Sequence, residues 1–235
     1  MIRAQLLEQA ANWILETDRT HPLRVAVDGI DAAGKTTIAD ELAEVIQRLG
    51  RPVVRASLDH FHRPRAERYR RGKESPEGYY LDSFDYPLLI SSLLGPLGPA
   101  GDRRYRISAF DHLNDRPVQA VFHAAANETV LIYDGVFLLR PELSACWDYR
   151  IFLQVDFKTA LSRAVQRDRK LFGSIGEIES KYALRYFPGQ QLYLNQSCPQ
   201  ALAELVMDNN EPERPLIVQQ KPAPAEVPAG FHPRG

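Results

Sequence analysis

The sequence has few cysteines, little charge imbalance and no long apolar run, and each shortage excludes a class of protein. Its 235 residues include two cysteines, Cys146 and Cys198, far apart in the chain. We therefore expect reduced thiols, not a disulfide framework or a metal site. The formal net charge is −1, which gives no electrostatic reason to expect a nucleic-acid or membrane partner. No apolar run approaches the about 20 residues of a membrane span.

What is present is the composition of an ordinary globular domain. Hydrophobic residues make up 44% of the chain and charged residues 25%, enough for one sizeable core. We expect a single domain over residues 1–218, with residues 1–21 contributing an N-terminal helix. The prolines and few large apolar residues of 219–235 predict a disordered tail. The N-terminus lacks a signal-peptide pattern, so we expect a cytoplasmic protein.

One stretch, VAVDGIDAAGKTT at residues 25–37, combines an apolar run with the pattern GxxxxGK[ST]. This is the phosphate-binding P-loop, in which glycines let backbone N–H groups turn inward and the following helix adds its positive end. Lysine then reaches the β- and γ-phosphates, and threonine places a hydroxyl on Mg²⁺. The residues expected to bind ATP here are Gly29, Asp31, Ala32, Ala33, Gly34, Lys35, Thr36 and Thr37.

Short apolar runs alternate with stretches of helical periodicity along the chain. This alternation predicts an α/β fold with a mainly parallel sheet and helices on both faces. The expected strands are residues 23–27, 53–57, 129–135, 151–155, 204–208 and 216–218. The expected helices are residues 1–17, 38–49, 86–94, 156–171 and a segment from 178 to about 192 that breaks near Pro188.

Residues 58–123 interrupt this alternation. Residues 58–85 show no regular pattern, and a loop of that length in a compact domain is usually functional. Residues 104–110 and 118–123 predict a small hairpin beside the main sheet. We expect these insertions to bind the acceptor.

Two carboxylates stand where parallel strands end, which is where ligands collect in α/β sheets. Asp59 follows the second strand and could orient and deprotonate an acceptor hydroxyl. Asp134 ends the strand at 129–135 and could hold Mg²⁺ together with Thr36 and Asp59. The alternative for each aspartate is a turn residue that caps a loop.

Three segments together, residues 29–37, 58–64 and 133–137, resemble the phosphoribulokinase/uridine kinase family of P-loop kinases, over roughly residues 22–212. The resemblance implies a three-layer P-loop kinase fold with a twisted sheet, with ATP and Mg²⁺ as cofactors and a small-molecule hydroxyl as acceptor. It implies that Asp59 is the catalytic base and that Lys35 acts on the phosphates. It also implies an arginine-bearing lid within residues 157–190, in which Arg163 and Arg167 bind ATP and Arg167 is catalytic.

On the acceptor side, the resemblance implies a nucleoside such as uridine or cytidine, phosphorylated at its 5′-hydroxyl. Tyr79 stands where the family has a ribose-binding aspartate, and Asp82 or Asp85 could serve instead. Tyr105 resembles a base-binding tyrosine of the family. The substrate-binding set is therefore Asp59, Phe61, Tyr79, Asp82 and Tyr105. Nicotinamide riboside and pantothenate remain alternative acceptors.

Two other classes of function stay open at this point. A P-loop regulatory NTPase would use the same motif without an acceptor. A nucleic-acid-binding module would use the basic run at residues 63–73, although the rest of the chain balances its charge. The sequence leaves the choice between ATP and GTP and any assembly into a homo-oligomer undecided.

Overall fold

A six-stranded sheet forms the centre of the computed structural model, which describes residues 2–119 and 121–224. The strand order is β10-β9-β8-β1-β7-β2. All neighbours are parallel except β10, which runs antiparallel to β9. The strands are β1 (Leu23–Gly29), β2 (Val53–Ser57), β7 (Val130–Gly135), β8 (Tyr149–Gln154), β9 (Leu205–Asp208) and β10 (Leu216–Gln220).

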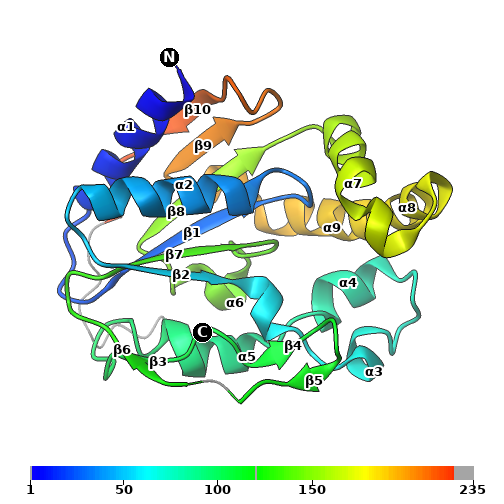
Figure 1. Ribbon diagram of the computed structural model, residues 1–235, viewed down its shortest axis with the longest axis horizontal. Helices are drawn as coiled ribbons and strands as arrows, with labels where there is room; N and C mark the ends of the chain where they lie inside the picture. The colour runs from blue at the N-terminus through cyan, green and yellow to red at the C-terminus, as the bar shows by residue number, and fades with distance from the viewer. Residues whose placement is uncertain (1, 120, 225–235) are drawn as a thin grey trace.

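Helices cover both faces of this sheet, as Figure 1 shows. The longer elements outside the sheet are α1 (Arg3–Leu15), α2 (Lys35–Arg48), α7 (Phe157–Phe172) and α9 (Phe187–Ser197). On one face, Val25 and Val27 of β1 pack in a cluster with the buried residues of α1 and α2. On the other face, Ala26 packs with residues of α9 and of the helical stretch 86–94. The predicted three-layer fold with a mainly parallel sheet is confirmed.

The predicted periodicity of the second helix is confirmed for Ile38, Leu42, Val45 and Ile46, which are all buried, but not for Leu49, which is the exposed C-cap of α2. β1 and β7 are buried along their whole length, as expected for parallel strands covered on both faces. Shorter elements follow: α5 (Tyr86–Leu89), η2 (Ile90–Leu94), α6 (Pro141–Ser144), α8 (Ile175–Lys181), η3 (Tyr182–Tyr186) and α10 (Pro199–Leu202).

The expectation that residues 58–85 are irregular is wrong. This segment contains η1 (Leu58–Phe61), α3 (Arg65–Arg68) and α4 (Pro76–Asp82). Ser75 starts α4 by accepting a hydrogen bond from the Gly78 N–H, with proline in the first turn, which suits the fixed φ of that residue. These helices are too short for apolar periodicity to show them.

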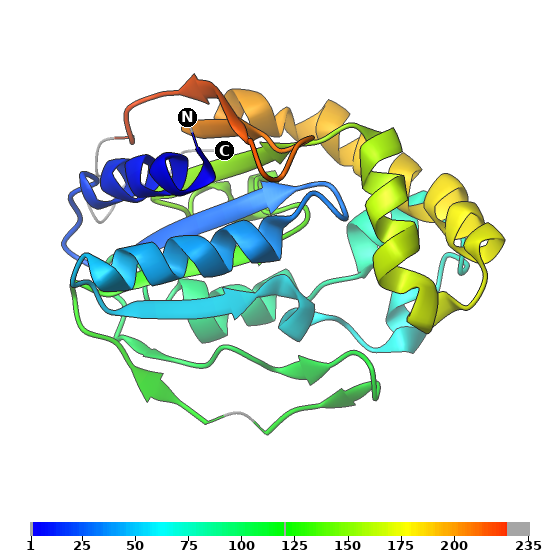
Figure 2. The same cartoon turned by 45° about the horizontal axis from the view of Figure 1, so that its top comes forward.

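The single hairpin expected at 104–123 is two separate ribbons. β3 (Arg104–Tyr105) pairs with β6 (His123–Ala124), and β4 (Phe110–Asp111) pairs with β5 (Arg116–Pro117). Figure 2 shows both on the β2 side of the sheet.

Near Pro188 the helical segment changes type and does not stop: the π-helical η3 is followed directly by α9, with proline in the first turn of α9, where no N–H is needed. Gly189 serves close packing instead. A Cβ on Gly189 would meet the Pro76 carbonyl oxygen and the Tyr79 Cδ1 at 2.9 Å each. The predicted tail begins inside β10, which extends to Gln220, and residues 225–235 of that prediction lie outside the described residues.

Candidate active site

The P-loop connects β1 to α2 at the carboxyl end of the sheet. Gly34 is the N-cap of α2 with φ of 90°, a left-handed conformation that favours glycine. A Cβ on Gly29 would approach the Leu153 carbonyl oxygen to 2.8 Å. The loop therefore needs both glycines of the motif, one for its turn and one for its contact with β8.

Lys35 is the first residue of α2 and lines the cleft beside the loop. Its Nζ donates a hydrogen bond to the Ile30 carbonyl oxygen at 2.7 Å. The ammonium group thus lies over the P-loop itself, where the phosphates of a nucleotide would be cradled.

Thr36 and Asp134 meet across neighbouring elements, as the sequence predicts. The Thr36 hydroxyl donates to Asp134 Oδ2 at 2.7 Å. Asp134 is buried, and Arg55 Nη2 lies 2.8 Å from its Oδ1 without hydrogen-bond geometry. Oδ1 therefore remains a buried acceptor oxygen, beside a hydroxyl and at the end of β7.

This all-oxygen pair fits a hard cation such as Mg²⁺, which takes few protein ligands and keeps water and phosphate oxygens. Within the described ranges, no group of three or more His, Cys, Asp or Glu residues could hold a metal ion by itself. The Thr36–Asp134 pair therefore suits a Mg²⁺ ion that is also bound by a nucleotide, and does not suit an ion held by protein ligands alone.

Asp59 reaches the same cleft from the end of β2. Ser57 pairs with Asp134 in the register of β2 and β7, so the turn η1 starts beside the Mg²⁺ candidate. Asp59 is exposed and lines the cleft. No side-chain hydrogen bond or ion pair joins its carboxylate to the described residues, which leaves this carboxylate able to accept a proton from an incoming hydroxyl.

His62 lies close to Asp59 and stacks on His112, with ring centroids 4.6 Å apart. Its Nδ1 lies 2.9 Å from the Asp59 carbonyl oxygen. Burial, together with His112 and Arg68, lowers the pKa of His62 to about 3 despite the Asp59 hydrogen bond. His62 is therefore neutral near pH 7.

Asp31 of the P-loop joins the loop to two other elements. Its Oδ2 accepts hydrogen bonds from the Tyr79 hydroxyl of α4 at 2.7 Å and from Gln190 Nε2 of α9 at 2.6 Å. Burial and the neighbouring Asp31 carboxylate raise the pKa of Tyr79 well above its usual value. Tyr79 therefore stays protonated and keeps donating to Asp31.

A second aspartate, Asp28, lies buried just before the P-loop. It accepts hydrogen bonds from the Gly29 N–H at 2.8 Å and from the Tyr193 hydroxyl. Burial raises its pKa to about 6, although these hydrogen bonds and Lys35 act in the opposite direction. Tyr193 also accepts from the Leu139 N–H at 3.0 Å, so Asp28 links the end of β1 to α9.

The lid arginines occupy different positions. Arg167 lines the cleft. Its Nε and Nη2 donate to the two Asp168 carboxylate oxygens at 2.6 and 3.0 Å, and Nη2 also donates to the Tyr182 hydroxyl. Arg163 does not line the cleft, because its Nη2 donates to the Asn209 and Asn210 carbonyl oxygens at 2.8 and 2.9 Å. Arg163 thus ties α7 to the turn after β9.

The predicted acceptor residues are not all brought together. Tyr79 lines the cleft with Asp59, whereas Phe61 is fully buried in the core. Asp82 is buried under Arg70 and Arg71; their hydrogen bonds hold its pKa below the usual value although burial acts to raise it.

Tyr105 also lies apart from the cleft and packs against His123 in the β3–β6 ribbon. The roles of these residues and of the P-loop residues stay predictions.

The cleft that collects these side chains has a volume of about 830 Å³. Figure 2 shows α7, α8 and the start of α9 beyond the carboxyl ends of the strands. Sequence reasoning missed three kinds of lining or supporting residue. They are Arg68 of α3, Arg185 of η3, and the P-loop supports Gln190 and Tyr193 of α9. The one sequence signal for these residues was the concentration of basic side chains at 63–73.

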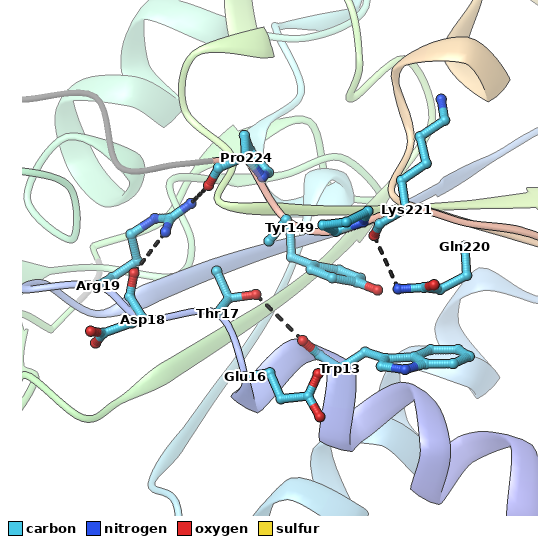
Figure 3. Close-up of a pocket in the computed structure, with 11 residues that line it drawn as sticks. Trp13, Glu16, Thr17, Asp18, Arg19, Tyr149, Gln220, Lys221 and Pro224 are labelled. Atoms are coloured by element: carbon cyan, nitrogen blue, oxygen red, sulfur yellow. Dashed lines mark hydrogen bonds between the residues drawn. The ribbon is translucent and has the colours of Figure 1, made fainter.

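A second hollow of about 410 Å³ lies away from all of these residues, between the end of α1 and residues 220–224 (Figure 3). Trp13 and Tyr149 line it, and Arg19 Nη2 donates to the Pro224 carbonyl oxygen at 2.6 Å across its rim. None of the predicted site residues lines it. Among the described residues, no helix is long and apolar enough to cross a membrane.

A parallel sheet with a glycine-rich loop between β1 and α2 defines the class of P-loop α/β proteins. The model of the phosphoribulokinase/uridine kinase family matches residues 25–201. The chain belongs to this family.

Individual relatives agree with this placement. Uridine-cytidine kinase B of Dictyostelium discoideum is 28% identical over 149 residues, 63% of this chain. The match spans 59% of that relative's own length.

Solved structures share the fold. A structure described as a possible uridine kinase from Bacillus stearothermophilus has a TM-score of 0.69 at 22% identity, covering 86% of this chain and 97% of that one. Phosphoribulokinase from Rhodobacter spheroides has a TM-score of 0.58 at 15% identity, covering 81% of this chain and 71% of that one.

Proposed function

We propose that this protein is an ATP-dependent kinase that transfers the γ-phosphoryl group to a hydroxyl of a small molecule. One observation carries the proposal. Asp59, a carboxylate without a side-chain partner among the described residues, shares one cleft with the P-loop Lys35 and with the Thr36–Asp134 pair. A phosphoryl transfer needs these groups together: a phosphate cradle, a Mg²⁺ site and a base at the acceptor.

Each residue has a defined part in this proposal. The P-loop N–H groups and Lys35 hold the phosphates. Thr36 and Asp134, together with Asp59 from the neighbouring turn η1, would hold Mg²⁺, which when bound neutralises charge on the phosphates. Arg167, carried on the lid helix α7, stabilises the negative charge that develops on the transferred group.

The acceptor hydroxyl gives its proton to the Asp59 carboxylate, and its oxygen forms a bond to the γ-phosphorus. The bond from that phosphorus to the β,γ-bridging oxygen breaks, and ADP leaves with the electron pair. The products are ADP and the phosphorylated acceptor.

For the acceptor, the resemblance and the printed name of the 28% identical relative support a nucleoside such as uridine or cytidine, and nicotinamide riboside and pantothenate are the alternatives. A cytoplasmic location and assembly into a homo-oligomer remain predictions. Because Asp59 needs an acceptor to act on, a kinase and a regulatory NTPase differ in one measurable property, which is acceptor dependence.

The test is ADP release with ATP and Mg²⁺, with and without each member of a panel containing uridine, cytidine, nicotinamide riboside and pantothenate. We expect release that depends on an acceptor, and transfer of label from γ-³²P-ATP to that acceptor. Equal release with and without every acceptor would favour the P-loop NTPase and contradict the kinase.

A further inference from the structure

The lining of the cleft is strongly cationic on the side away from the P-loop. The basic residues that line the whole cleft are Lys35, Arg65, Arg68, Lys73, Arg167, Lys181 and Arg185. The acidic residues that line it are Asp31, Asp59, Asp134 and Asp168. All of these acids except Asp59 are already held by described partners.

The excess charge comes from elements other than those that would hold ATP. Arg65 and Arg68 belong to α3, Lys73 follows α3, and Arg185 belongs to η3. Figure 1 places α3 on the far side of α4 from the P-loop. The proposed function assigns the phosphates to Lys35 and Arg167, which leaves this second basic group available to the acceptor.

Two of these guanidinium groups are buried, and burying a charge without a paired opposite charge has a large desolvation free energy. Arg185 is 5% exposed, and it donates to the carbonyl oxygens of residues 68, 72, 73 and 75 at 3.1–3.4 Å. It stacks over the Tyr69 ring at 4.9 Å. Among the described residues, no carboxylate forms an ion pair with it.

Arg68 is the second buried guanidinium and is 9% exposed. Its Nη2 lies 3.4 Å from an Asp115 carboxylate oxygen, a long contact. Its Nε is buried without a hydrogen-bond partner. A buried N–H donor without an acceptor calls for a partner, and a group bound in this cleft would supply one.

Two further cations stand at the same place without a side-chain partner among the described residues. Arg65 and Lys73 are exposed and line the cleft. Neutral sugar hydroxyls would leave this set uncompensated, because they carry no charge. A carboxylate or phosphate would accept from Arg68 and balance Arg65 and Lys73 together.

We propose that the acceptor carries an anionic group, a carboxylate or a phosphate, which binds at Arg65, Arg68 and Lys73 beside Arg185 while its hydroxyl faces Asp59. The inference rests on the proposed kinase activity and narrows its acceptor class. It favours an anionic acceptor over the neutral nucleosides that the resemblance alone supports. Pantothenate, left open by the sequence, belongs to the favoured class.

The experiment compares acceptors in pairs that differ in one anionic group. The pairs are pantothenate and pantothenol, glycerate and glycerol, and fructose 6-phosphate and fructose, with uridine as a neutral nucleoside. Direct binding is measured by calorimetry and turnover by ADP release, each with a no-acceptor control. We expect at least one anionic member to bind and react with kcat/KM tenfold or more above its neutral partner. The members of the first two pairs differ in a carboxylate, and those of the third pair differ in a phosphate, so the pairs show which anionic group the site prefers.

Substitutions then locate the anionic group. Arg65→Gln and Arg68→Gln should each raise the KM of the anionic acceptor about tenfold, because each removes a charged contact, and leave the KM of ATP within twofold. Arg70→Gln is the matched control, since it removes the same charge from the same segment but pairs with Asp82 outside the cleft. Arg65 is exposed, so its variant tests the site even where Arg68→Gln lowers stability.

Two outcomes would overturn the proposal. One is a neutral member of any pair, or uridine, reacting as well as the anionic compounds; the kinase would then stand without the anionic site. The other is the absence of binding by every anionic member. Binding of an anionic compound without acceptor-dependent ADP release would instead support the anion site and contradict the proposed kinase.

Discussion

The phosphate-binding loop on the donor side of the cleft is one continuous stretch between β1 and α2, whereas the acceptor side is assembled from α3, α4, the turn after β4 and η3. On the donor side, two glycines and a lysine meet one another because they are neighbours in the chain. On the acceptor side, Arg68 and Arg185 are 117 residues apart and meet only through the packing of η3 on the 68–75 segment. A site made of residues that are neighbours in the chain can be recognised as a sequence motif. A site made of residues from distant segments cannot.

The largest expected effect is a loss of turnover without a loss of nucleotide binding. Asp59→Asn removes the proposed base at the acceptor side and should lower kcat on the order of 10²-fold or more. ATP binding should stay close to wild type, because the P-loop is untouched. The measurement is steady-state turnover beside calorimetric titration of ATP.

The matched control is Asp102→Asn, an equal change at an exposed carboxylate that does not line the cleft. Near-wild-type turnover in Asp59→Asn would remove Asp59 from the mechanism.

The next effect falls on the donor side, where binding and chemistry are coupled. Lys35→Ala removes the ammonium that lies over the P-loop, and we expect kcat/KM for ATP to fall by roughly 10²-fold, with weaker ATP binding and slower turnover together. Lys158→Ala, on the exposed surface of α7, should change neither. Unchanged ATP kinetics in Lys35→Ala would contradict the P-loop assignment.

The smallest effect lies where the two sides touch, at the hydrogen bond from Tyr79 to Asp31. Tyr79→Phe removes that donor and leaves Gln190 on the same oxygen. We expect the acceptor KM to rise by about three- to tenfold, the value of one hydrogen bond, with a smaller change in the KM of ATP.

Tyr149→Phe is the control for this change, since it also removes a buried hydroxyl, one without a hydrogen-bond partner and distant from the cleft. If the KM of ATP rises more than that of the acceptor, Tyr79 belongs functionally to the donor side.

The same contrast explains what the sequence could predict. The sheet, the P-loop and the meeting of Thr36 with Asp134 follow from local patterns, since apolar runs specify buried parallel strands and the strands bring their ends to one edge. The helices α3 and α4 escaped prediction because capping and packing, not periodicity, specify them. Asp82 is a polar residue whose sequence context suggests a ligand, yet two arginines bury it.

Gly189 illustrates a further consequence for anyone who would engineer this protein. Ranked by helix propensity alone, a glycine directly after the proline in the first turn of α9 is a weak point that alanine should improve. Its surroundings reverse that ranking, because a methyl group there would collide with the carbonyl of Pro76 and the ring of Tyr79. Protein engineering guided by secondary structure alone would choose Gly189 early. The alanine introduced there would displace α4, the helix that carries Tyr79 to the P-loop.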